Sequence, residues 1–205
     1  MSKNHTASDQ LGFDNLLAAA ETENRNRIFE RETGHLPATM NEGLAYYRDL
    51  LKRHHDAMMA ADASGTMELR KDAHNLAVKL NGGRTGILMD HAPGDVLARE
   101  TAAGFGSEPL WGQNGDFIVE SGVMKVRIEM RGIFGIGGAH CYWPGFSAHA
   151  VERDKPFLSA TGYRSFLGLY AEPCEGMTPS EFVRRFLGQY VEEELHGKLC
   201  DIDPC

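Results

Sequence analysis

The feature that most constrains the fold is the alternation of apolar and charged residues from Val123 to Arg131. The even positions hold Met124, Val126, Ile128 and Met130, and the odd positions hold Lys125, Arg127, Glu129 and Arg131. Side chains of a β-strand point to opposite faces with a period of two, so we expect the apolar set in a core and the charged set near water. The pattern predicts a sheet with one buried face, which is typical of antiparallel sheets covered on one side by helices.

The region around this strand is rich in glycine, aromatic and β-branched residues from residue 105 onward. Such a composition, interrupted by turn residues, is typical of short strands. We expect these strands at about residues 116–120, 123–131, 133–136, 139–143, 146–151 and 163–170.

The regions before and after the strands have helical patterns, expected at about residues 9–33, 40–61, 67–80, 94–103 and 179–196. Thr39 and Glu42 have the spacing of a capping box, in which each side chain binds the other residue's backbone N–H group. Thr178 and Glu181 have the same spacing, with Pro179 at the first helical position. Two of the expected helices therefore have a clear start.

The fold class predicted from these elements is α+β. A one-sided antiparallel sheet, over about residues 110–170, packs against N-terminal helices and a C-terminal helix. At 205 residues and 42% hydrophobic, the chain is long enough to bury a core without disulfides. We expect one domain over residues 1–205, with a mainly helical part (1–104), a sheet part (105–177) and the C-terminal helix (178–196).

The charge balance excludes some classes of partner. The chain has 21 basic and 29 acidic residues, a formal net charge of -8, whereas direct binding to nucleic acid needs a basic face. No apolar run reaches the roughly 18 residues of a membrane span, and the polar start lacks the apolar region of a secretory signal. We therefore expect a cytoplasmic protein whose four cysteines are reduced, and no membrane or direct nucleic-acid partner.

A glycine-rich stretch from Gly135 to Val151 contains the best candidates for catalysis: His140, Cys141 and His149. A nucleophilic cysteine needs a nearby base to form its thiolate, and a histidine on an adjacent strand would serve. In the alternative interpretation, Cys141 is a small buried hydrophobic residue and the two histidines lie on the polar face of a sheet.

Metal binding is a second possible chemistry. Cys174, Cys200 and Cys205 are potential metal ligands, in addition to His140, Cys141 and His149. Structural zinc sites use short paired spacings such as C-x2-C, and the chain has none. We therefore predict no metal and no cofactor. His54 and His74 would converge if the helices at 40–61 and 67–80 pack together, although a histidine on an apolar face is more often a core residue bonded to a backbone carbonyl or a carboxylate.

Four further residues are candidates for binding: Trp111, Trp143, Tyr163 and Arg164. Trp111 lies among turn-forming residues, where a large ring caps a ligand pocket or anchors a partner, or else covers the domain's own core. Tyr163 and Arg164 lie at the start of an expected strand, where they would bind an anion or remain solvated.

Two function hypotheses follow. The preferred one is an acidic cytosolic binding or regulatory protein that acts by protein–protein interaction, with a basic or nucleic-acid-binding protein as a suitable partner. The alternative is a small orphan enzyme, with Cys/His or metal-assisted chemistry around His140, Cys141 and His149. The weak apolar stripe of residues 9–33 leaves a homodimer open.

Overall fold

The computed structural model describes residues 7–135, 145–167 and 173–203, with side chains described from residue 15 onward. Residue contacts divide the chain into two compact units, Met1–Leu36 and Pro37–Cys205. Each unit is described by itself below. The single-domain organisation expected from the sequence stays a prediction.

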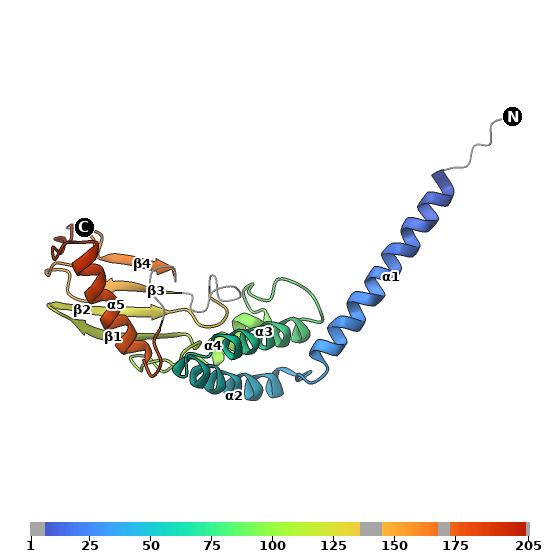
Figure 1. Cartoon of the computed structure of the whole chain (residues 1–205), viewed down its shortest axis with the longest axis horizontal. Coiled ribbons are helices and arrows are strands. Elements are labelled where there is room, and N and C mark those ends of the chain that lie inside the picture. The colour runs from blue at the N-terminus through green and yellow to red at the C-terminus, as the bar shows by residue number, and fades with distance from the viewer. Residues whose placement is uncertain (1–6, 136–144, 168–172, 204–205) are drawn as a thin grey trace. The chain divides into compact units, whose positions relative to one another are not determined.

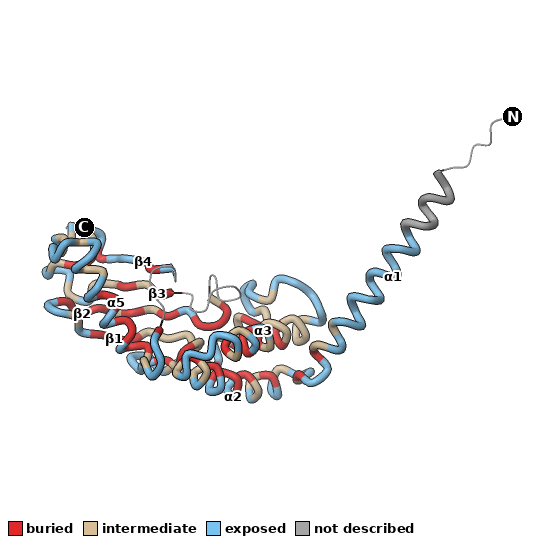
Figure 2. The backbone as a smooth tube through the Cα atoms, in the orientation of Figure 1, coloured by how far each residue is buried: buried red, intermediate tan, exposed pale blue. Residues whose placement is uncertain are grey.

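The first unit contains one helix, α1 (Ala7–Thr33), which runs for 27 residues without interruption (Figure 1). Its described side chains are largely exposed, as the pale blue tube in Figure 2 shows. The exposed apolar residues are Leu16, Leu17 and Ile28. Helices in proteins owe most of their stability to the packing of an apolar face against the rest of the fold. The described part of α1 has little such face.

The first two helices of the second unit begin at capping side chains. At the start of α2 (Met40–Met59), the Thr39 side chain accepts a hydrogen bond from the Glu42 N–H, as the capping box predicts. Asp62 caps α3 (Ala63–Leu80) by accepting from the Gly65 N–H at 2.9 Å, so this helix begins four residues before the expected position. The third helix of this unit is α4 (Pro93–Glu100), which has Pro93 at its first position. None of the helices in the described ranges combines the length and the apolar character that crossing a membrane requires.

Four strands form one antiparallel sheet in the order β1-β2-β3-β4 (Figure 1). They are β1 (Gly115–Ser121), β2 (Met124–Met130), β3 (Gly145–Ala150) and β4 (Tyr163–Leu167). The expected strand at 133–136 is wrong for residues 133–135, which form a turn. The Ile133 N–H donates to the Gly112 carbonyl at 2.9 Å, so this turn binds a loop and not a strand. The expected strand at 139–143 lies outside the described residues.

The covered face of the sheet packs against the C-terminal helix, α5 (Pro179–Glu193), which crosses it in Figure 1. Val126 and Ile128 are fully buried on this face, as the alternation in β2 predicts. Phe166 of β4 meets Phe186 of α5 edge to face, with ring centroids 4.9 Å apart. Both halves of the capping box at Thr178 are present. The α+β class and the one-sided sheet are therefore confirmed.

Candidate functional site

The face of the sheet that no described helix covers is the first candidate site, because strand register aligns functional side chains across it. Ile118 pairs with Arg127, Arg127 with His149, and His149 with Tyr163, so one residue from each strand contributes to a continuous row. We call this surface the open face. A second row runs beside it and contains Asp116, Glu129, Ser147 and Ser165.

Charged residues on the open face pair with one another. Arg127 Nη1 lies 2.9 Å from Asp116 Oδ1, and Glu129 pairs with Arg131. The second oxygen of Glu129 lies 3.5 Å from His149 Nε2, a buried atom that has no hydrogen-bond partner among the described residues. The network can hold these side chains in place, but it leaves their outer surfaces accessible to a partner.

Two hollows border the open face. One, of about 250 Å³, lies over β3 and β4 and is lined by Ser147 and Tyr163 among others. The other, of about 360 Å³, lies between α4 and the sheet and includes Phe105. Glu129 and Arg131 line both hollows, so the depressions meet at the end of β2.

Large apolar side chains also reach solvent here. Ile118 is 47% exposed, Tyr163 46% and Leu167 54%, and all three belong to strands of the sheet. Phe105, in the loop before β1, is 92% exposed. Single exposed apolar residues are ordinary, but a group of them beside charged residues is typical of an interaction surface.

The predicted catalytic residues are described only in part. His140 and Cys141 lie outside the described residues, and so does the predicted binding residue Trp143. His149 lies on the open face, with its ring 5.0 Å from that of Tyr163. The Tyr163 hydroxyl in turn lies 3.3 Å from the Ser147 hydroxyl. The catalytic role of this group stays a prediction.

The two predicted binding residues at the start of β4 do not share a site. Tyr163 faces the open side of the sheet, whereas Arg164 pairs with the buried Ala148 and lies on the α5 side. Its guanidinium carbon sits 5.5 Å from the centre of the Tyr190 ring. Neighbouring residues of a strand point to opposite faces, so they serve different surfaces.

Trp111 is 3% exposed and is held by three hydrogen bonds. His54 Nδ1 lies 2.8 Å from the Trp111 carbonyl oxygen, and His55 Nδ1 accepts from the Trp111 backbone N–H at 3.2 Å. The indole N–H donates to the Met177 carbonyl at 2.9 Å. This placement matches the alternative interpretation, in which Trp111 covers the protein's own core and ties α2 to the segment before α5.

His54 is a fully buried core histidine whose tautomer follows from its partners. The Trp111 carbonyl can only accept, so Nδ1 carries the proton; Arg70 Nε donates to Nε2 at 3.0 Å, so Nε2 carries none. Burial, reinforced by the Arg70 charge, lowers the pKa of His54 from 6.5 to about 3. The ring is therefore neutral at physiological pH. His74 instead bonds the Arg70 carbonyl, so the structure shows no His54–His74 pair among the described contacts.

Gly112 lies against this network with a φ of +87°. A Cβ atom there would come within 2.5 Å of His54 Nδ1. The left-handed backbone and the close approach both require glycine at this position.

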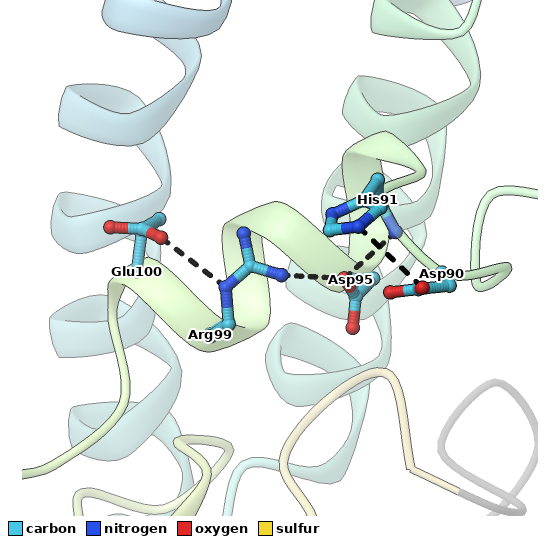
Figure 3. Close-up of polar contacts among 5 residues, drawn as sticks. All are labelled: Asp90, His91, Asp95, Arg99 and Glu100. Atoms are coloured by element: carbon cyan, nitrogen blue, oxygen red, sulfur yellow. Dashed lines mark hydrogen bonds and ion pairs between the residues drawn. The ribbon is translucent and has the colours of Figure 1, made fainter.

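A separate surface cluster contains Asp90, His91 and Asp95, whose ligand atoms lie within 4.8 Å of one another (Figure 3). Arg99 Nη1 already pairs with Asp95 at 3.0 Å, and the same carboxylate accepts from the His91 backbone N–H at 3.2 Å. Ala92, the residue before α4, has no capping side chain. The contacts of Asp95 therefore indicate a role in starting α4, with its charge offset by Arg99.

Two cysteines are described, Cys174 and Cys200, and both are free thiols. Arg185 donates to Cys174 Sγ at 3.3 Å. Within the described ranges, neither cysteine belongs to a group of three potential metal ligands. Cys205, another cysteine considered as a ligand from the sequence, lies outside those ranges.

The chain is similar to two proteins from Escherichia coli, each named Protein KlcB. One is 39% identical over 151 residues, which are 71% of this chain and 35% of the relative. The other is 34% identical over 167 residues, which are 77% of this chain and 33% of the relative. The chain thus spans about a third of the length of the curated relatives it matches. No family model and no solved structure matches it.

The printed name of these relatives states no activity, so the function must be argued from the surfaces themselves. The sequence contained a signal for part of the open face, because the alternation in β2 places Arg127 and Glu129 opposite the core. Sequence reasoning missed Ile118 and Phe105 as exposed apolar residues. Their exposure depends on which strands and loops remain uncovered, and no local pattern states this.

Proposed function

We propose that this chain is a protein-binding module that acts by protein–protein interaction through its open face. The observation that supports this proposal most is the row from Ile118 to Tyr163, which crosses all four strands and combines exposed apolar groups with half-exposed charges. Protein interfaces combine an apolar centre with a polar rim in this way.

The charges of the open face would contribute to the specificity of binding more than to its affinity. The Arg127–Asp116 pair is more than a third exposed at both partners, so its contribution to stability is small. Charges that are paired and half-exposed chiefly determine the orientation and the identity of a partner. The net charge of -8 favours partners of basic character.

The test is affinity capture from the native host cell with matched variants. Ile118→Asp places a charge at the β1 end of the row, and Val123→Asp makes the same change at an exposed residue in the β1–β2 turn. We expect a stoichiometric partner that the unmodified chain and Val123→Asp retain and that Ile118→Asp loses. Thermal unfolding of both variants must match the unmodified chain.

Retention of the same partner by Ile118→Asp would contradict the proposal that the open face is the interface. Capture of no specific partner by the unmodified chain would contradict the protein-binding function itself. The two results are distinguishable because the unmodified chain captures a partner in the first and none in the second. Val123→Asp reports any general effect of an added charge.

A further inference from the structure

We infer that an extended, basic segment of a partner protein adds to the sheet along β4 and places its side chains in the groove between β4 and α5. This inference rests on the proposed function, because it specifies the chemistry of the partner. It concerns a different surface from the open face, so the two can be tested separately.

The first argument is the hydrogen-bonding capacity of β4, which ends the sheet. The Ala150 N–H donates to the Gly162 carbonyl at 2.9 Å. Hydrogen-bonded and non-bonded pairs alternate in an antiparallel ladder, so the backbone groups of Tyr163, Ser165 and Leu167 point away from β3. In the parts of the chain that the structure describes, no strand pairs with this outer side.

The outer edge of β4 is protected by side chains at one end only, where the strand begins at Tyr163. The outward carbonyl of Tyr163 accepts from Ser159 Oγ at 2.7 Å and from Thr161 Oγ1 at 3.2 Å. Its N–H donates to Thr161 Oγ1 at 3.4 Å. Proteins often protect exposed edges in such ways. Ser165 has no comparable side-chain cap among the described contacts, and it is exposed.

The third argument is the groove beside that position, with a volume of about 200 Å³. Its aromatic lining comes from Phe166, Phe186 and Tyr190, its carboxylates from Glu193 and Glu194, and its one basic group from Arg164, which lies over the Tyr190 ring. The Ser165 side chain belongs to the open face, so the part of Ser165 that lines this groove is its main chain. Unpaired backbone groups and an aromatic groove therefore lie side by side.

The groove suits arginine or lysine. In a strand added beside β4, the residues next to the one paired with Ser165 would point to the α5 side, as Arg164 and Phe166 do. Long basic side chains can lay their aliphatic part on aromatic rings and extend the charged end to carboxylates. Glu193 and Glu194 form no ion pair within the described part of the chain, so both carboxylates are accessible to a partner's cations.

The experiment measures binding of a short synthetic peptide in which arginine alternates with threonine, by fluorescence anisotropy with the full chain. The double variant Glu193→Gln with Glu194→Gln should weaken binding about three- to tenfold, as expected for two exposed ion pairs. Glu192→Gln is the control, since Glu192 lies on the same helix outside the groove.

A second pair of variants tests the strand edge. Ser165→Pro removes an N–H group that points away from the sheet, which an edge strand tolerates, and should weaken peptide binding about tenfold. Ser165→Ala retains the N–H group and should bind like the unmodified chain. Circular dichroism and thermal unfolding establish that each variant is folded, and the glutamine variants keep the inference testable if the proline variant is not.

Absence of peptide binding, or equal binding by all variants, would overturn the inference. A dimer in sedimentation that Ser165→Pro converts to monomer would also overturn it, because β4 would then pair with a second copy of this chain. Neither result affects capture of a partner through Ile118. Failure of the inference is therefore distinguishable from failure of the proposed function.

Discussion

The two faces of the sheet differ sharply although they alternate along the same strands. In β2, Ile128 is fully buried beneath α5, whereas its neighbour Arg127 is half-buried and pairs with Asp116 on the open face. The covered face contributes apolar burial, which is the main stabilising term in folding. The open face contributes paired charges and exposed apolar groups, which add little stability and suit recognition. Under the proposed function, residues that stabilise the fold and residues that contact a partner therefore alternate along the same strand.

The histidine clusters repeat this contrast between buried and exposed. His54 is enclosed by Trp111 and Arg70, and its charged form is strongly disfavoured. His91 lies on the surface beside Asp90, with its backbone N–H bound to Asp95. The side chain of His54 therefore supports the core, whereas His91 contributes only its backbone N–H to the start of α4.

The largest expected effect comes from truncating the covered face. Ile128→Ala should lower the free energy of unfolding by about 2–5 kcal/mol, because it removes buried methyl groups and leaves a cavity. Ile118→Ala, in the neighbouring strand on the open face, should cost about 1 kcal/mol or less. Urea unfolding of both variants measures the difference. Equal losses would mean that the open face is packed like a core.

The second expected effect is a loss of stability in acid from His54. Its pKa is about 3 in the folded chain and 6.5 unfolded, so between these values the unfolded state binds the extra proton. The contribution of the neutral His54 ring to the free energy of unfolding is therefore complete above pH 6.5. It falls as pH decreases, by about 2 kcal/mol at pH 5. Unfolding measured at pH 5 and pH 7.5 tests this.

The matched variants for this test are His54→Gln and His91→Gln. His54→Gln should lessen the dependence on pH, and His91→Gln, which changes an exposed histidine, is the matched control. If both variants kept the full dependence, the acid sensitivity would come from other groups and the buried histidine would not be its source.

The smallest expected effect concerns the ion pair of the open face. A double-mutant cycle with Arg127→Ala and Asp116→Ala should give a coupling free energy of about 0.2–1 kcal/mol, reduced by added salt. A larger coupling that salt does not change would show that this face is shielded from water, which would weaken the contrast between the two faces.

Much of the architecture could be predicted from local patterns. The N-cap at Thr39, the capping box at Thr178 and the alternation in β2 each depend on residues close in sequence, so local patterns predict them directly. The apolar pattern predicts a start for α3 at residue 67, four residues late, although Asp62 is a strong type of capping residue. The apolar residues at 133–134 favour a strand in the sequence, but in the structure they belong to a turn, and Phe134 packs against Tyr47 of α2 and His74 of α3.

The candidate sites were far less predictable. Tyr163 and Arg164 were grouped because they are neighbours in sequence, but strand geometry places them on opposite surfaces. Glu193 and Glu194 lie on a helix whose charges look solvated in the sequence, and only the packing of α5 beside β4 makes them part of a groove. The hydrogen bonds of His54 to Trp111 and Arg70 join three segments that no local pattern connects.

The sequence by itself determined the element types and the face of β2 that turns to the core, because side-chain periodicity and capping act within a few residues. Only the tertiary structure decided which strand ends the sheet, which face stays open and where carboxylates meet aromatic rings. Those features arise from contacts between residues distant in sequence. Their positions therefore depend on how the whole core packs.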